Sequence, residues 1–283
     1  PEGGVVELVE GTFTVDSPLH IKKNNVTLRG AGMNKTIIIR GTSGIEFVIE
    51  VSQWDDAKAR LAWNYNNKDS SYWFNYPAVE FVPSNLVWNV TIMDLCIKGN
   101  GSAYGDHSGI ILEEVGDSEV LRIKTENHWQ HGILIGNTLN VTVKECKSEH
   151  DGQAVMVGGA ASPHYINNTI ADTRRYDSIE FNGVWDSPFT GYSRPDPTIT
   201  GNNVTGSSQG GMFIYGTSNC KVSENIVEKC ARYGMSVTIS TNNLIHRNIL
   251  RKNQWEGIIY ETTNEAKNND FIGNLILSLI HIS

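Results

Sequence analysis

The sequence is poor in cysteine and in positive charge, and it has no long apolar run. Its four cysteines lack a Cys-x-x-Cys spacing, and Cys96 and Cys146 fall in equivalent apolar positions of a repeat. We therefore expect buried free thiols, without a disulfide framework or a metal site. No run of about 18 apolar residues occurs, so we predict no membrane span. The net charge of -8 gives no general positive field that would attract a polyanion, which argues against nucleic-acid and membrane partners.

A repeat is the main feature that the sequence does have. Each copy is a small residue, usually glycine, followed by alternating side chains, as in Gly-Met-Phe-Ile-Tyr at 211–215. The copies begin at positions 109, 132, 152, 178, 211, 234 and 257. The commonest interval is 23 residues. Short β-branched runs with polar turns at such a period predict an all-β solenoid of about ten rungs.

The first forty residues make this prediction more specific. Gly-Gly-Val-Val-Glu-Leu-Val-Glu-Gly-Thr-Phe-Thr-Val at 3–15 is followed by Val-Thr-Leu-Arg-Gly-Ala-Gly at 26–32. This opening resembles that of the pectate-lyase-like superfamily of right-handed, single-stranded parallel β-helices. The resemblance implies three parallel sheets wound into a prism, with a polysaccharide groove along one of them. We therefore expect a β-helix that acts on a glycan.

No linker divides the chain, so we predict a single domain over 1–283 with two loop excursions. The aromatic-rich segment 52–84 is either a groove wall that stacks on sugars or a plug that covers the helix surface. The segment 184–197 leaves a strand directly and is expected to reach over the groove. Residues 277–283 lose the Asn and Gly pattern and resemble the translation of a sequencing-library adapter, so we expect this tail not to be native.

Aligning the rungs stacks the residues that precede each repeat start. The nearest position holds Ser108, His131, Asp151, Asp177, Gly210, Tyr233 and Glu256. The position before it holds His107, Gln130, His150, Tyr176, Gln209, Arg232 and Trp255. A run of Asn residues at 168, 203, 225 and 248 is expected to form an internal ladder.

This alignment suggests acid–base chemistry. Asp151 and Asp177 would lie one rung apart, and two carboxylates that close cannot both ionise cheaply, so one pKa should rise as a general acid requires. We predict Asp151, Asp177 and Glu180 as the acid–base groups, with His131 and His150 as partners. Tyr176 is a candidate proton donor. The alternative is that Asp and His before a glycine only cap rung corners.

A second set of residues is expected to bind the substrate. Arg175 and Arg232 are candidates for sugar carboxylates, which guanidinium groups bind in a bidentate manner. The expected sugar-stacking and contact residues are Trp185, Tyr215, Trp255 and Glu256. No metal site is predicted, and a bridging Ca²⁺ ion stays open because oxygen ligands abound without a recognisable ligand loop.

We therefore expect a secreted or cell-surface enzyme, a lyase or a hydrolase, that cleaves or epimerises a polysaccharide containing uronate. The catalytic motifs of polygalacturonases and of alginate epimerases are not present as sets, so no family's catalytic residues carry over. The alternative is a non-catalytic β-helix that binds glycans, such as a tailspike or a surface protein. The expected assembly is a monomer or a homotrimer.

Overall fold

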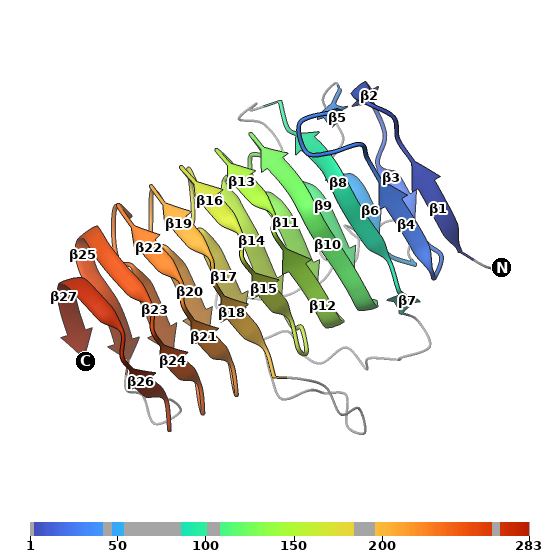
Figure 1. The fold of residues 1–283 in the computed structure, drawn as a ribbon. Helices are drawn as coiled ribbons and strands as arrows, with labels where there is room; N and C mark the ends of the chain where they lie inside the picture. Colours follow the sequence, from blue (N-terminus) through green and yellow to red (C-terminus); the bar gives the residue numbers. More distant parts are fainter. Residues whose placement is uncertain are drawn as a thin grey trace, which may run out of the picture.

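The computed structural model describes residues 3–41, 47–53, 86–100, 108–183, 196–261 and 267–282. The strands in these ranges join into one 27-stranded parallel sheet that winds into a coil (Figure 1). The predicted right-handed parallel β-helix is confirmed. No helix able to span a membrane occurs in the described part of the chain.

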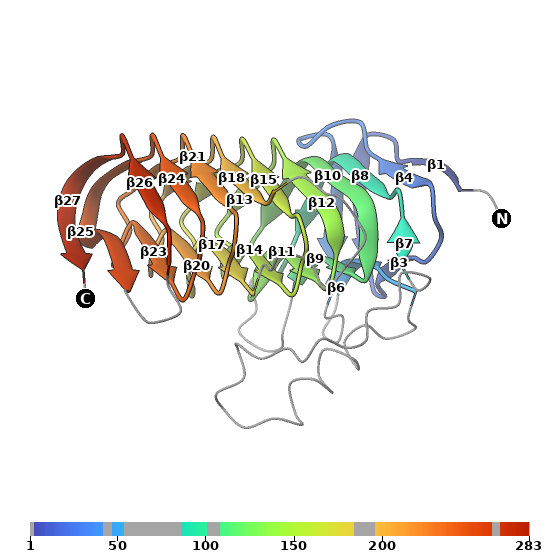
Figure 2. The same cartoon turned by 90° about the horizontal axis from the view of Figure 1, so that it is seen from below.

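The coil has three faces, which we name A, B and C, and each is a stack of hydrogen-bonded strands from successive rungs. Face A contains β3 (Leu19–Ile21), β6 (Phe47–Val51), β9 (Ser108–Glu113), β11 (His131–Gly136), β14 (Gln153–Gly158), β17 (Ile179–Asn182), β20 (Met212–Tyr215), β23 (Met235–Thr238) and the second parts of β25 (Ile249–Glu261) and β27 (Leu275–Ile282). Figure 2 shows the strands of face A lying side by side from β9 to β23.

The other two faces complete each rung. Face B contains β1 (Gly4–Glu7), β4 (Val26–Arg29), β7 (Val87–Trp88), the first parts of β8 (Thr91–Lys98) and β10 (Val115–Glu126), β12 (Leu139–Lys144), β15 (His164–Ile166), β18 (Thr198–Thr200), β21 (Lys221–Ser223), β24 (Leu244–His246) and β26 (Asp270–Ile272). Face C contains β2 (Gly11–Val15), β5 (Thr36–Arg40), the second parts of β8 and β10, β13 (Lys147–Glu149), β16 (Thr169–Ala171), β19 (Asn203–Thr205), β22 (Ile226–Glu228) and the first parts of β25 and β27.

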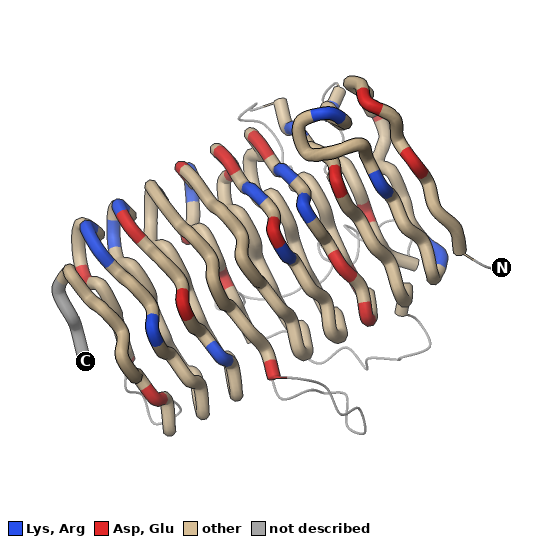
Figure 3. Tube along the Cα trace, in the orientation of Figure 1, with Lys and Arg blue, Asp and Glu red and all other residues tan. Residues whose placement is uncertain are grey.

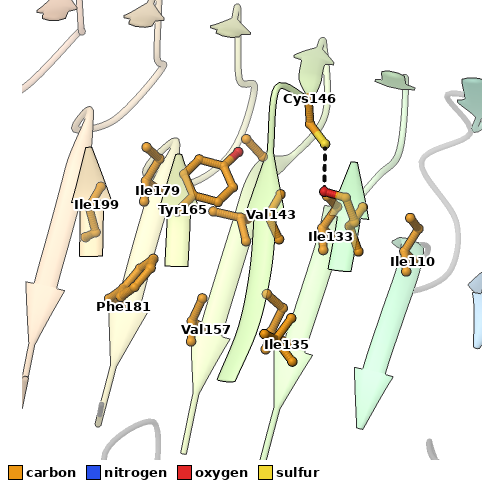
Figure 4. Packing of buried hydrophobic residues seen from close by; sticks show 14 of the residues in the cluster. Ile110, Ile133, Ile135, Val143, Cys146, Val157, Tyr165, Ile179, Phe181 and Ile199 are labelled. Atoms are coloured by element: carbon orange, nitrogen blue, oxygen red, sulfur yellow. Dashed lines mark hydrogen bonds between the residues drawn. The ribbon is translucent and has the colours of Figure 1, made fainter. Parts of the chain in front are cut away.

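The core is a column of apolar side chains inside the coil. Side chains alternate in and out along each strand, so every second residue points into the coil and stacks on its equivalent in the next rung. Ile133, Val155 and Ile179 form one such row on face A, each at most 2% exposed. Figure 4 shows Ile133 and Ile179 of this row together with Cys146, whose pKa burial raises to about 12. All four cysteines are buried free thiols that pack as small apolar groups.

Left-handed backbone positions turn the chain between faces. At the corner between faces C and A, Asn127, His150 and Asp172 occupy equivalent positions with φ of 61°, 58° and 53°. Gly206 follows them one rung later with φ of 78°. Asn, Asp and Gly tolerate this region best, which explains the polar and glycine-rich corners of the repeat.

Lys and Arg residues are interspersed with Asp and Glu residues along the coil (Figure 3). On face C, Lys98 Nζ lies 3.2 Å from Glu126 Oε1, and Lys124 Nζ lies 2.7 Å from Glu149 Oε2. Such solvated pairs stabilise the fold little.

An asparagine ladder runs inside the corner between faces B and C. It consists of Asn168, Asn202, Asn225, Asn248 and Asn274. The side-chain oxygen of each accepts the backbone N–H of the preceding member, for example 2.9 Å from Asn202 N to Asn225 Oδ1. The ladder was predicted, but Asn203 was wrongly placed in it. Asn202 is the buried member, and Asn203 is exposed at the start of β19.

The predicted excursions fall almost wholly outside the described residues, because 54–85 and 184–195 are not among them. Trp185 also lies outside the described residues. The backbone of β27 continues the parallel pairing on β25 through Ile282. The prediction that 277–283 is not native stays a prediction.

We expect Asn225→Ala to lower the free energy of unfolding by about 2–4 kcal/mol, because it removes the acceptor of the buried Asn202 N–H and a hydrogen bond to the Ile199 carbonyl. Chemical denaturation followed by circular dichroism measures this loss. Asn203→Ala is the matched control at the exposed neighbouring position. Equal effects of the two substitutions would contradict the ladder's role.

Candidate functional site

Three outward rows of side chains run along face A, at about 4.8 Å per rung. The first row holds His131, Gln153, Asp177, Gly210, Tyr233 and Glu256. The second row holds Met156, Glu180, Phe213, Ser236 and Ile259. The third row holds Gly158, Asn182, Tyr215, Thr238 and Glu261. Acidic, aromatic and amide groups therefore meet around β17.

The predicted register is wrong at one rung. His131 pairs with Gln153 rather than with Asp151. The reason is that Gly152 is not the repeat glycine: buried Ala154 takes that position, and Gly152 is a corner glycine whose Cβ would lie 2.1 Å from the Trp129 carbonyl oxygen. The same shift moves His150 out of its predicted position next to the first row, and Gly152 occupies that position instead.

Asp151 points into the coil and is 0% exposed. Its Oδ1 accepts hydrogen bonds from the backbone N–H and Nδ1 of His128, each at 2.9 Å. Its Oδ2 accepts the hydroxyls of Thr125 and Ser148 at 2.6 and 2.7 Å. A carboxylate with four internal donors and no exposed surface is held inside the coil, so the predicted outward position of Asp151 is wrong.

His150 lies in the left-handed corner after β13, where its Nε2 is 3.7 Å from Asp172 Oδ2. It belongs to the corner between faces C and A rather than to the outward rows of face A. The predicted partnership of His150 with the acid–base groups is therefore not found.

Asp177 faces outward just before β17. Its Oδ1 accepts the backbone N–H of Gly210 at 2.7 Å, and its Oδ2 accepts the hydroxyl of Tyr233 at 2.9 Å. Burial raises the pKa of Asp177, and these two hydrogen bonds and nearby Arg232 offset part of the rise.

Gly210 makes the contact between Asp177 and Tyr233 geometrically feasible. Tyr233 stands two rungs beyond Asp177, and its ring crosses the intervening rung over Gly210. A Cβ at Gly210 would lie 2.1 Å from Tyr233 Cε2 and 2.6 Å from Asp177 Oδ1. Burial and the neighbouring Asp177 raise the pKa of Tyr233, so the phenol stays protonated and acts as a donor.

Glu180 stands in the second row of the same strand. Its Oε2 accepts Gln153 Nε2 at 2.7 Å, and its Oε1 accepts the side-chain amide of Asn182. Burial is the main cause that raises the pKa of Glu180, and the Asp177 charge adds to it. Glu180 and Asp177 thus form a half-buried, electrostatically coupled carboxylate pair.

His131 is 8% exposed, and its Nδ1 lies 3.1 Å from Ser108 Oγ. Burial lowers the pKa of His131 to about 4, with a further contribution from Arg175, so the imidazole is neutral near pH 7. It stands in the predicted first row, two rungs from Asp177.

Two arginines stack on aromatic rings at either end of this stretch. The guanidinium of Arg175 lies 4.1 Å from the ring centre of Trp129 and 5.2 Å from that of Tyr176. The guanidinium of Arg232 lies 5.4 Å from the ring centre of Trp255. Tyr176 is therefore a stacking partner of an arginine and has no described contact with the carboxylates.

Phe213 and Tyr215 form an aromatic pair one rung beyond Glu180 and Asn182, with ring centres 5.8 Å apart and an interplanar angle of 23°. Glu256 lies in the first row beyond Tyr233. Among the described residues, no three His, Cys, Asp or Glu side chains are grouped as a metal would need. Binding of Ca²⁺ remains a prediction.

Sequence analysis missed three residues of this cluster: Gln153, Asn182 and Tyr233. Tyr233 was in the aligned row but was not assigned a role. The alignment gives the neighbours in adjacent rungs, and it does not show that a tyrosine ring reaches a residue two rungs away. Gln153 could have been found by placing Ala154, not Gly152, at the repeat position.

Comparison with known proteins supports the fold. Residues 151–278 match the family model described as a right handed beta helix region. Among curated proteins, none matches the chain in sequence.

Several solved structures are similar to the chain at low identity. The A-module of the mannuronan C-5 epimerase AlgE4 from Azotobacter vinelandii has a TM-score of 0.71 and 16% identity, over 96% of this chain and 68% of its own. The ORF18 protein of Geobacillus virus E2 has a TM-score of 0.63 and 16% identity, over 96% of this chain and 54% of its own. The DFA-IIIase of Arthrobacter chlorophenolicus A6, in complex with GF2, has a TM-score of 0.66 and 13% identity, over 96% and 66%.

The chain spans 54% to 68% of the length of these three proteins. Their likeness covers 96% of this chain. The chain therefore has the fold of a right-handed parallel β-helix.

Proposed function

We propose that the chain is a secreted or cell-surface enzyme that cleaves a polysaccharide lying along face A, with Asp177 and Glu180 as its acid–base pair. The observation that carries this proposal is the coupled pair itself, two outward carboxylates on one rung with raised pKa values. A general acid must hold its proton near neutral pH, and burial with a like-charged neighbour supplies that condition. The solved relatives include an epimerase of mannuronan, which is consistent with a glycan substrate.

Hydrolysis of a glycosidic bond fits this pair best. One carboxyl group donates its proton to the glycosidic oxygen as the C–O bond breaks. The other carboxylate activates water or attacks the sugar carbon, and water completes the reaction. Tyr233 is a poor base for an elimination, because its pKa is raised and its hydroxyl already donates to Asp177. Lyase and epimerase chemistry would need a different base.

The polysaccharide in this proposal contains uronate. This part rests on Arg175 and Arg232, whose stacked guanidinium groups can donate two parallel hydrogen bonds to a sugar carboxylate. Tyr215 and Trp255 are candidates for stacking on sugar rings, and Trp255 is 52% exposed. Glu256 is positioned to accept sugar hydroxyls at the far end of the first row.

A non-catalytic glycan-binding or tailspike-like role is the second candidate, and the likeness to a protein of Geobacillus virus E2 favours it. It predicts binding to a glycan without any turnover. The expected assembly, a monomer or a homotrimer, can be measured by light scattering in either case.

We expect Asp177→Asn and Glu180→Gln each to lower kcat about 100-fold or more on the glycan that the protein cleaves, since each removes a proton-transfer group. The assay measures reducing ends released from a panel of polyuronates and neutral glycans. Asp172→Asn at a corner and Glu119→Gln on face B are matched controls that should keep full activity. Products with the absorbance of unsaturated sugars would instead identify a lyase.

The same substitutions should stabilise the protein at neutral pH. Because the folded pKa values of Asp177 and Glu180 are raised, the stability linked to their protons is fully present below the unfolded values, about 3.9 and 4.3, and is lost as the pH rises through the folded values. We expect Glu180→Gln to raise Tm by about 1–3 °C at neutral pH. The gain should vanish below about pH 4. A gain that did not depend on pH would contradict the raised pKa.

Tyr233→Phe should shift the acid limb of the kcat profile to higher pH, because Asp177 loses a hydrogen bond that lowers its pKa. Gly210→Ala should give the same shift, since the new methyl group displaces the Tyr233 ring. Tyr260→Phe, on a tyrosine outside the cluster, is the control. Identical pH profiles for all four proteins would remove Tyr233 from the site.

A further inference from the structure

We propose, on the basis of the proposed function, that the glycan is mixed in charge. Acidic groups would be bound at two separated positions of face A, and a neutral sugar would lie between them, at the carboxylate pair. The inference follows from the positions of Arg175 and Arg232 and from the lack of Lys and Arg in strands β14, β17, β20 and β23.

One acidic position is set by Arg175. Its guanidinium stacks on Trp129, just before β11, so one planar face is covered, and its N–H edge forms no hydrogen bond with a described residue. Arg174 beside it is directed elsewhere, with Nη2 3.1 Å from Asn127 Oδ1. Arg175 forms no ion pair with a described acid, so it can accept a carboxylate from a ligand.

The other acidic position is set by Arg232, which stacks on Trp255 in β25. On face A, Trp129 belongs to the rung of β11, and Trp255 belongs to the rung of the second part of β25. These two rungs are five pairing steps apart, through β14, β17, β20 and β23. At about 4.8 Å per step, the two aromatic rings stand roughly 24 Å apart along the prism. Several sugar units fit between them.

The stretch between the two arginines is neutral or acidic. Strands β14, β17, β20 and β23 contain no Lys or Arg. Their outward side chains beyond β17 are the Phe213 and Tyr215 rings and the hydroxyls of Ser236 and Thr238. An aromatic pair of this kind packs on the apolar face of a sugar and contributes no charge.

The carboxylate pair makes a charged sugar unfavourable at this centre. Burial raises the pKa of both Asp177 and Glu180, and the Asp177 charge raises that of Glu180 further. A third carboxylate beside them would add repulsion in a partly desolvated site, and Arg232 offsets only part of the rise in the pKa of Asp177. A polymer acidic at every residue would place such groups there, whereas one with interspersed neutral residues would not.

The test measures binding separately from turnover. Affinity electrophoresis compares fully de-esterified polygalacturonate, pectin of intermediate methyl esterification and nearly fully esterified pectin, and likewise alginate and its partial propylene glycol ester. Each series keeps the sugar and changes only the charge density. We expect the pectin of intermediate esterification to bind about fivefold or more tightly than both extremes of its series, or the partial ester of alginate to bind more tightly than alginate by the same factor.

Arg175→Gln and Arg232→Gln should each abolish most of that preference, because each removes a charge-assisted contact. Arg247→Gln, an exposed cation at another corner, is the matched control and should leave the preference intact. Equal or tighter binding of the fully acidic polymers, no binding in either series, or a preference unchanged in both variants would overturn the inference. Preferential binding without release of reducing ends would instead overturn only the proposed function.

Discussion

The whole molecule depends on the parallel hydrogen bonding that joins each rung to the next. Because this pairing keeps equivalent residues in register, a side chain's surroundings are set by its position in the rung and by the two rungs beside it. The same constraint builds the apolar column, the internal asparagine ladder and the outward rows of face A. A shift of one rung by a single residue would exchange inward and outward side chains at once.

Much of the fold could be predicted, because glycine spacing and alternating patterns report backbone periodicity directly. The resemblance of the opening motif to right-handed β-helices predicted the handedness of the coil. The site was harder. Asp177, Glu180, Arg175 and Arg232 were placed on the right face, whereas Asp151 and His150 were assigned to it through the wrong glycine, Gly152. The neighbouring Ala154 fills the repeat position equally well, and a sequence pattern alone does not distinguish the two when a rung is short.

Side-chain reach was the second limit. A row order gives neighbours one rung apart, but Tyr233 passes over Gly210 to meet Asp177 two rungs away. That contact requires a residue without a side chain, Gly210, in the middle rung, and no single sequence motif indicates this requirement. Likewise, the interior position of Asp151 became evident only from its four hydrogen-bond donors, since the residue type suits a surface as well.

The bridge over Gly210 means that three consecutive coils share one chemical unit. Excision or duplication of a whole coil between Asp177 and Tyr233 would preserve the stacking of every strand, because all rungs are built alike. It would nevertheless separate or crowd the phenol and the carboxylate. Such a protein can therefore gain or lose its chemistry by changing its number of coils, while its architecture and core remain intact.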